Sequence, residues 1–247
     1  MGLGWDSYLC LLSGKPASFF VDLDLIDCAP IQGLTHLVWI SLSMAKPRSD
    51  GLSSLDEFPT LSAIAHALDI AVEGQPGIVQ AARLTTAGRQ DYFFYVAQPD
   101  DWKQRCTLAL SQFSQYKYDI FTAGVDEEWK EYFNVFYPRD DELEVIKNRR
   151  VGEALKSHGD ALVAPRDIRH FVYFPTIESR ADFVAEVQGD GFSILLSEMT
   201  KGRYLALVSR NDVPQQPEID TVTRRLSCAA KARGGNYDGW ETHVVLS

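Results

Sequence analysis

The last third of the chain alternates between two hydrophobic periods, in an order that few folds can accommodate. Four segments alternate apolar and polar side chains, as strands with one buried face do: 168–175, 192–198, 204–209 and 240–246. Segments 177–188 and 219–230 instead repeat apolar side chains at the spacing of an amphipathic helix. The order strand–helix–strand–strand–helix–strand predicts a ferredoxin-like split β-α-β sandwich, a unit of about 80 residues. We therefore expect a domain boundary near residue 165.

The preceding residues show a similar succession of strands and helices, with extra helices after it. Strand patterns occupy 19–26, 36–44, 78–85, 91–97 and 118–122, and helical spacing occupies about 61–72, 102–113, 129–136 and 142–157. We expect an α+β protein of two units. The first, over 1–165, is an acidic domain with a related antiparallel sheet and helices on one face, and the second is the ferredoxin-like domain over 166–247. No sequence repeat relates the two.

Charge is divided unevenly between these two units. The 247 residues include 24 Lys and Arg against 34 Asp and Glu, a formal net charge of -10. Residues 166–247 contain 10 basic and 11 acidic residues, which leaves 14 basic and 23 acidic residues before them. Non-specific nucleic-acid binding depends on clustered Lys and Arg, so direct nucleic-acid binding is not expected of the N-terminal unit. The argument is weaker for the near-neutral C-terminal unit. The acidic balance of the chain favours a basic partner.

The chain shows no targeting or membrane signal. Its N-terminal apolar run has no preceding Lys or Arg and no small-residue cleavage pattern, and no segment approaches the roughly 20 apolar residues of a membrane span. The four cysteines are widely scattered, without a CxxC pair or a metal-ligand spacing: Cys10, Cys28, Cys106 and Cys228. We expect a cytoplasmic protein with reduced thiols, no metal and no cofactor.

Catalytic signatures are missing from the sequence. It contains no GxSxG, P-loop, GxGxxG or HExxH motif, and no Ser or Cys stands beside a His at a recognisable nucleophile spacing. His170 and His243 fall on the first and last predicted strands of the C-terminal unit, which need not be adjacent, so a two-histidine site is not favoured.

Paired carboxylates offer an alternative of another class. Asp22 and Asp24 lie two apart on a predicted strand and share a face, where they could bind a cation, although a solvated strand face is the commoner explanation. The acidic runs 126–128 and 140–142 precede helical patterns and are explained by helix capping. A metal-assisted hydrolase or a small-molecule binding protein using Asp22, Asp24 and Glu57 therefore stays open as the second hypothesis.

Aromatic residues on the C-terminal strands allow a third hypothesis, an RNA-binding module. Phe171, Tyr173 and Tyr204 could stack on bases, as in an RNA-recognition sheet. Pro175 follows the first strand where that module needs basic residues, so core packing is favoured. The basic side of the last helix is interpreted as a solvated face and consists of Arg224, Arg225, Lys231 and Arg233.

The sharpest motif lies near the C-terminus and reads Gly-Gly-Asn-Tyr-Asp-Gly-Trp-Glu over 234–241. Two glycines can leave a helix in left-handed geometry, and Asp238-Gly239 favours a turn. Tyr237 and Trp240 bracket this turn with large amphipathic rings. The motif predicts either a helix-to-strand corner or a presented binding loop, because rigid aromatic anchors are common at interfaces.

Together with segment 169–175 and the helix after it, this motif resembles the bacterial regulator of ribonuclease E activity B family, over 166–247. Members of that family are small α+β proteins that bind the endoribonuclease and inhibit it, and they are not nucleases. The resemblance implies an interaction site, whose candidate residues are His170, Tyr173, Tyr237, Asp238, Gly239, Trp240 and Glu241.

The N-terminal unit is similar to an uncharacterised bacterial domain family that occurs beside this regulator-like domain. The similarity rests on Trp5, segment 16–24, Gly51-Leu52, Glu57 and segment 129–138, and it supplies no activity. Our leading hypothesis is a non-enzymatic, cytoplasmic regulatory protein that binds another protein and modulates ribonuclease E or RNA turnover. The expected partner is a basic segment of a ribonuclease assembly, which the acidic N-terminal unit would attract.

Overall fold

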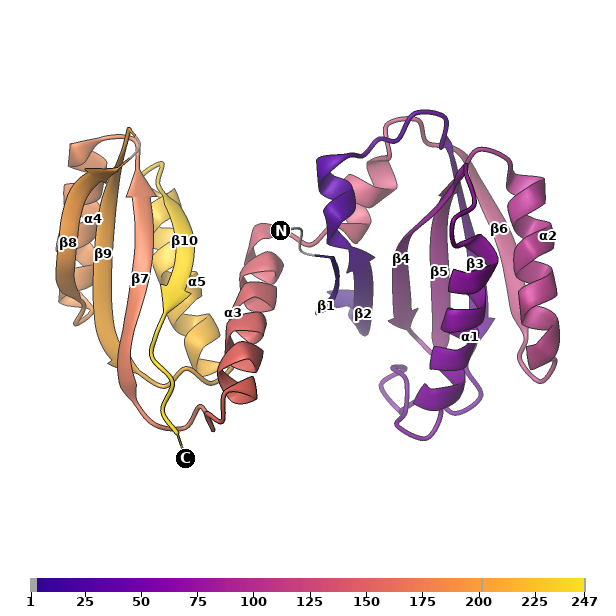
Figure 1. The fold of residues 1–247 in the computed structure, drawn as a ribbon, viewed down its shortest axis with the longest axis horizontal. Helices are drawn as coiled ribbons and strands as arrows, with labels where there is room; N and C mark the ends of the chain where they lie inside the picture. The colour runs from indigo at the N-terminus through magenta and orange to yellow at the C-terminus, as the bar shows by residue number, and fades with distance from the viewer. Residues whose placement is uncertain (1–3, 201, 247) are drawn as a thin grey trace. The chain divides into compact units, whose positions relative to one another are not determined.

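The computed structural model describes residues 4–200 and 202–246 and divides into two compact units, Met1–Arg139 and Asp140–Ser247 (Figure 1). We call them unit 1 and unit 2. Unit 1 has 10 Lys and Arg against 17 Asp and Glu, and unit 2 has 14 against 17. The acidic excess therefore lies mainly in unit 1.

Unit 1 is built on one wide sheet. In chain order its elements are β1 (Trp5–Leu12), β2 (Lys15–Asp22), the 3-10 helix η1 (Leu23–Asp27), β3 (His36–Ser43), α1 (Phe58–Val72), β4 (Ile78–Thr86), β5 (Arg89–Val96), α2 (Pro99–Leu110), the short 3-10 helix η2 (Ser111–Phe113), β6 (Tyr118–Val125) and the π-helix η3 (Tyr132–Phe136). The six strands pair antiparallel in the order β1-β2-β4-β5-β3-β6. The succession β3-α1-β4-β5-α2-β6 thus has the split β-α-β order, and hairpin β1–β2 widens the sheet beyond β4.

The main core of unit 1 lies between the sheet and its two long helices. Helix α1 buries one stripe at helical spacing, as the sequence predicts: Leu61, Ile64, Ala65, Leu68 and Val72. This stripe packs on the sheet face that carries Val38, Ile40 and Leu42, and α2 lies beside α1 on the same face (Figure 1). Each fully buried aliphatic side chain contributes about 1.5–3 kcal/mol, so this stripe fixes α1 on the sheet.

The opposite face of the sheet is partly covered by η3. The Phe136 ring lies 4.6 Å from the Phe93 ring and 6.4 Å from the Phe19 ring, centroid to centroid. The turn into this helix is held by Asp126, whose carboxylate accepts hydrogen bonds from the backbone N–H groups of Lys130 and Glu131 at 2.8 and 3.2 Å. Asp126 thus holds the segment before η3, as the acidic run suggested, although the N-cap residue Glu131 makes no side-chain cap hydrogen bond.

Unit 2 has the predicted ferredoxin-like order. Its elements are α3 (Asp140–Ser157), β7 (Arg166–Phe174), α4 (Ile177–Gly189), β8 (Ser193–Thr200), β9 (Arg203–Asp212), α5 (Glu218–Lys231) and β10 (Asn236–Glu241). The strands pair antiparallel in the order β10-β7-β9-β8, and α4 and α5 lie on one face of the sheet (Figure 1). The α+β, two-unit fold class is confirmed.

The units divide at residue 139, whereas the sequence places the boundary near 165. Helix α3 lies between these two positions and packs against α5 within unit 2. It also shares a buried hydrogen-bond network with β10, described below. Whether residues 1–165 and 166–247 fold as separate domains therefore stays a prediction.

Two strands differ from their predicted bounds. Asp24 is not on a strand, because β2 ends at Asp22 and the chain continues into η1. The last strand runs over Asn236–Glu241 rather than 240–246, and beyond it Leu246 forms only an isolated bridge with Asp160. Hairpin β1–β2 begins with a strand that the sequence pattern did not indicate, because β1 lies at the edge of the sheet and buries only Tyr8.

Candidate functional site

The Gly-Gly motif of unit 2 ends helix α5 and starts strand β10. Gly234 has a φ of 68°, the left-handed geometry that closes a helix. At Gly235 a Cβ atom would overlap the ring of Phe174, so only glycine leaves this ring in its place without a shift. The register of β10 against β7 then shifts between Tyr237 and Gly239, which leaves exposed Asp238 in a bulge. The motif is therefore an edge strand with a bulge rather than a projecting loop.

Two of the candidate interaction residues form a buried pair inside unit 2. The His170 Nδ1 atom and the Tyr237 hydroxyl lie 2.8 Å apart, and both side chains are buried. Burial, together with the charge of Arg210, lowers the pKa of His170 to about 3, so its ring is neutral at physiological pH. Burial likewise raises the pKa of Tyr237 well above its usual value. This pair belongs to the core.

Trp240 joins β10 to both α3 and α5. Its indole Nε1 donates to Asn148 Oδ1 at 2.8 Å, and the Asn148 amide donates to Asp220 Oδ1 and Thr223 Oγ1, each at 2.8 Å. Trp240 also packs with Ile168 in a small apolar cluster. A buried network in which every member has a partner fixes side chains in one arrangement, so Trp240 attaches α3 to the sandwich.

A buried ion pair holds the connector between α3 and β7. Arg166 and Asp160 bond through two guanidinium nitrogens, and their side chains are 2% and 1% exposed. Asp160 also accepts from the backbone N–H groups of Leu162 at 2.8 Å and Val245 at 2.9 Å. These bonds, led by that of Arg166, lower the pKa of Asp160 despite its burial. This pair was not predicted from the sequence, because a single Asp and a single Arg six positions apart give no recognisable pattern.

Three of the candidate interaction residues are accessible at the sheet of unit 2. Glu241 is exposed and lies 3.7 Å from the guanidinium of Arg169 on the neighbouring strand. Tyr173 is half-buried, and the Arg203 guanidinium lies 4.4 Å from its ring centroid. Asp238 is exposed in the bulge of β10, so the accessible side chains of this edge carry both signs of charge. The structure thus separates the seven candidates into accessible side chains (Tyr173, Asp238, Glu241), a bulge glycine (Gly239) and buried framework (His170, Tyr237, Trp240).

The aromatic residues proposed to stack on RNA do not share a face. In β7, Phe171 and Tyr173 alternate with the buried residues Val172 and Phe174, whereas Tyr204 packs against the helix-side core. The basic side of α5 is largely paired: Arg225 lies 2.5 Å from Glu186, Arg233 also contacts Glu186, and Lys231 lies 2.6 Å from Asp140. These pairs leave little unbalanced positive charge for phosphates.

The three carboxylates of the hydrolase hypothesis bind backbone N–H groups instead of facing one another. Asp22 accepts from the N–H of Asp24 at 3.1 Å, and Asp24 accepts from Gly4 at 2.7 Å. Glu57 is 3% exposed and accepts from Ala45 and Lys46 at 2.6 and 2.7 Å, which fixes the loop after β3. His243 is exposed beyond β10 and is likewise not brought together with His170. Among the described residues, no three His, Cys, Asp or Glu side chains gather as metal ligands would.

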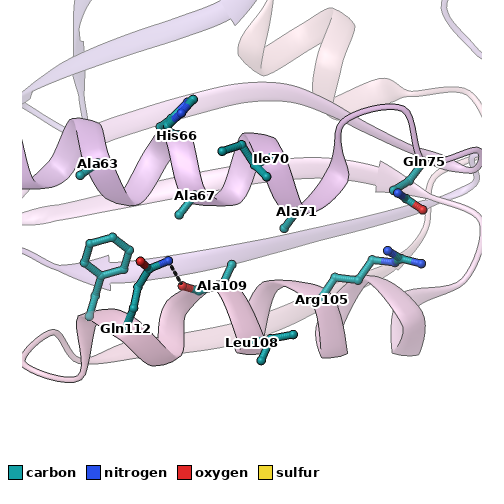
Figure 2. Close-up of a pocket in the computed structure, with 11 residues that line it drawn as sticks. Ala63, His66, Ala67, Ile70, Ala71, Gln75, Arg105, Leu108, Ala109 and Gln112 are labelled. Atoms are coloured by element: carbon teal, nitrogen blue, oxygen red, sulfur yellow. Dashed lines mark hydrogen bonds between the residues drawn. The ribbon is translucent and has the colours of Figure 1, made fainter.

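A groove of about 770 Å³ runs between α1 and α2 in unit 1. Figure 2 shows small side chains of α1, Ala67 and Ala71, directed toward α2, with Arg105 and Leu108 on the opposite wall. Its lining is mostly apolar, and Leu108 is 77% exposed. The groove results from small residues at the helix contact, and no charged group is buried in it.

These features define a two-unit α+β protein in which most sequence-predicted site residues build the framework. Residues 4–137 match the model of a family of unknown function, DUF695, and the chain belongs to this family. Residues 145–242 match the model of Regulator of ribonuclease activity B. Both matches confirm the resemblances found in the sequence, including the fusion of the two parts.

Other comparisons add little. No curated protein matches the chain. One solved structure, provisionally described as a glycine cleavage system transcriptional repressor, is 10% identical, with a TM-score of 0.23 over 85% of this chain and 98% of that chain. Another, an unknown protein from Galdieria sulphuraria, is 12% identical, with a TM-score of 0.24 over 85% of this chain and 99% of that chain. Scores this low inform neither fold nor function.

The helices were compared with the requirements of a membrane span. In the part of the chain that the structure describes, each helix is either too short or too polar to cross a bilayer.

Proposed function

We propose that this protein is a non-enzymatic regulator that binds another protein, and that its target belongs to ribonuclease E-dependent RNA turnover. The observation that carries the proposal is the match of residues 145–242 to Regulator of ribonuclease activity B. The match begins inside α3 and extends one residue beyond β10. It therefore spans the whole sandwich, together with the part of α3 that holds Asn148. A cytoplasmic location belongs to the same proposal, because transcript turnover takes place there.

The accessible surface of β10 and β7 is the proposed contact region. Asp238 and Glu241 supply negative charge on β10, and Tyr173 supplies a flat ring on β7 opposite Asn236. The buried pair His170–Tyr237 and the Trp240 network shape this strand from below. Unit 1 adds an acidic surface, so a basic segment is the partner that the charges favour.

The test combines partner capture with an activity assay on the full-length protein. Bacterial lysate is passed over the immobilised protein, and bound proteins are identified by mass spectrometry. In parallel, ribonuclease E cleavage of an RNA substrate is followed with and without micromolar protein. We expect a ribonuclease among the bound proteins and slower cleavage.

Charge reversals then test the surface. The double variant Asp238→Lys/Glu241→Lys should lose binding and inhibition at least tenfold. The control variant, Glu153→Lys, reverses an exposed charge on α3 in the same unit and should behave as the wild type. If no ribonuclease is recovered and cleavage is unchanged, the target is wrong. If both charge reversals behave alike, the contact region is wrong.

A further inference from the structure

A second groove of unit 1 runs beside α1, where the sheet extends beyond its helices. Because hairpin β1–β2 adds two strands next to β4, the sheet is wider than α1 and α2 can cover. The groove has a volume of about 680 Å³, within the size range of small-molecule sites. Trp5, Phe20 and Arg83 line it from the strands, and Asp69 lines it from α1.

The strand side of this groove is a rigid stack of rings and a guanidinium. Trp5 stacks on Phe20 with centroids 5.0 Å apart and an interplanar angle of 30°. The Arg83 guanidinium lies 5.2 Å from the Phe20 centroid and 5.4 Å from that of Tyr92. Cation–π contacts on two rings hold the guanidinium in place. Trp5 remains 36% exposed at the open end of the stack.

Two hydrogen-bond donors in the lining have no acceptor. Among the described residues, Arg83 Nε and the Gln80 side-chain amide nitrogen are buried without a hydrogen-bond partner. Gln80 is 8% exposed, and both residues line the groove. An unsatisfied buried donor costs about 1–3 kcal/mol. Two such donors in one concavity indicate that an acceptor group is missing from it.

The carboxylates that line the groove instead lack a cationic partner at hydrogen-bond distance among the residues that the structure describes. Asp69 Oδ2 lies 3.9 Å from Arg83 Nη2, longer than the roughly 2.7–2.9 Å of a charge-assisted hydrogen bond. Burial raises the pKa of Asp69, and the charges of Arg83 and His66 only partly offset this effect. Burial also raises the pKa of Asp22, which lines the same groove. These carboxylates would be stabilised by a further cationic group, because Arg83 is too far from Asp69 for a charge-assisted hydrogen bond.

We propose that this groove binds a free amino acid. Its carboxylate would accept from Arg83 and Gln80, its ammonium group would lie against Asp69, and its side chain would pack on the exposed part of Trp5. A zwitterion satisfies both deficits at once, whereas a simple anion would meet the carboxylates of Asp22 and Asp69. The site goes beyond the function proposed for unit 2, since it uses unit 1 alone.

His66 marks the boundary with the groove of Figure 2. Its side chain lines both grooves, and Figure 2 shows the ring on the side of α1 that points away from α2. The groove between α1 and α2 contains Arg105 but no acidic side chain in its lining. Arg105 therefore offers a control arginine in the same unit, close to a groove of similar size but of different charge.

The experiment measures binding of the 20 free amino acids to the full-length protein by calorimetry. For an aromatic ligand such as phenylalanine, two analogues carry one pole each: phenethylamine lacks the carboxylate and 3-phenylpropionate lacks the ammonium group. We expect at least one amino acid to bind with a Kd of about 1 mM or tighter, and its one-pole analogues to bind at least tenfold more weakly. Arg83→Met should weaken binding at least tenfold, whereas Arg105→Met should leave it unchanged.

Two further variants, Asp69→Asn and Trp5→Phe, test the site even if Arg83→Met does not fold. Asp69 has a half-exposed side chain, so its amide variant should fold and still lose binding at least tenfold. Ligand should change tryptophan emission in the wild type but not in Trp5→Phe. The proposal is overturned if no amino acid binds below about 10 mM, if the one-pole analogues bind equally well, or if Asp69→Asn binds as the wild type does.

Discussion

Unit 1 and unit 2 share a strand order but stabilise it with different chemistry. In unit 1 the second face of the sheet is covered by aromatic rings, such as Phe136 on Phe93 and Trp129 on Tyr95, the latter with centroids 3.8 Å apart. In unit 2 the additional helix α3 is attached by a small apolar cluster that includes its Leu155 and by a polar network through Asn148 and Trp240. A buried ion pair between Asp160 and Arg166 holds the connector after it. Both supplements include hydrogen bonds, such as that of Trp129 Nε1 to the Leu34 carbonyl, but stacked rings dominate in unit 1 and a buried ion pair and amide network mark unit 2.

The two units should differ in how much stability a single substitution removes. Aromatic packing is spread over many contacts, so its loss is graded. A buried ion pair depends on two side chains, and removing one leaves the other charge unpaired. Unit-specific signals are available, because Trp240 is the only tryptophan of unit 2 and the other four lie in unit 1. Labelling with 5-fluorotryptophan therefore reports each unit separately.

The largest expected effect is that of Arg166→Met. It leaves Asp160 buried without its cation, and the free energy of unfolding of unit 2 should fall by about 3–5 kcal/mol. Urea unfolding followed by fluorine NMR should show the loss at the Trp240 signal only. The control Arg105→Met removes an exposed pair with Asp101 in unit 1 and should cost less than about 1 kcal/mol. Equal effects of the two changes would show that burial does not make the Arg166–Asp160 pair critical for unit 2.

The next effect is that of Trp240→Phe, which removes the indole N–H and leaves Asn148 Oδ1 unsatisfied. We expect a loss of about 1–3 kcal/mol. Hydrogen exchange followed by mass spectrometry should show faster exchange in peptides of α3, with unit 1 unchanged. If α3 keeps its protection, its attachment to unit 2 does not depend on this network.

The sequence predicted the parts of both units that follow a regular period. The stripe of α1 from Leu61 to Val72 and the alternation in β3 repeat at fixed spacings, so each element could be located alone. Strand β1 could not, because Leu9 and Leu11 are exposed at 70% and 73% on an edge strand and no buried face imposes alternation.

The candidate site was harder to predict than the fold. Trp240 and Asn148 are 92 positions apart, and nothing local indicates that the ring is buried rather than presented. The motif around them was recognised from its glycines and aromatic residues, which identify a family but do not show which side chains face solvent. Arg83 and Asp69 likewise come together only when β4 lies beside α1.

Acidification acts with one sign on His170 of unit 2 and with the opposite sign on carboxyls whose pKa values burial raises, namely Asp69 and Asp91 of unit 1 and Glu144 of unit 2. His170 has its pKa lowered to about 3 in folded unit 2, whereas the unfolded chain binds this proton near pH 6.5. Its contribution to stability is therefore complete above pH 6.5 and is lost as the pH falls toward 3. In unit 1, Asp69 and Asp91 have pKa values raised by burial, so protonation at low pH favours the folded state.

Between pH 6 and pH 5, unit 2 should lose about 1 kcal/mol, since one proton corresponds to about 1.4 kcal/mol per pH unit. Urea unfolding at the two pH values, observed at the Trp240 fluorine signal, measures this loss. His170→Gln should remove most of the dependence while keeping a polar group beside Tyr237. An unchanged slope in this variant would assign the acid sensitivity to another group.

The smallest effect distinguishes the buried network from a surface ion pair as the attachment of α3. Lys231 Nζ lies 2.6 Å from Asp140 Oδ2 at the start of α3, and both side chains are at least half exposed. Exposed pairs contribute about 0–1 kcal/mol, so Lys231→Ala should barely change hydrogen exchange in α3. This holds even though Lys231 lowers the pKa of Asp140, because solvent screens the pair. If Lys231→Ala increases hydrogen exchange in α3 as much as Trp240→Phe does, the ion pair holds the helix. The buried polar network of unit 2 would then not have the stabilising role that the aromatic rings have in unit 1.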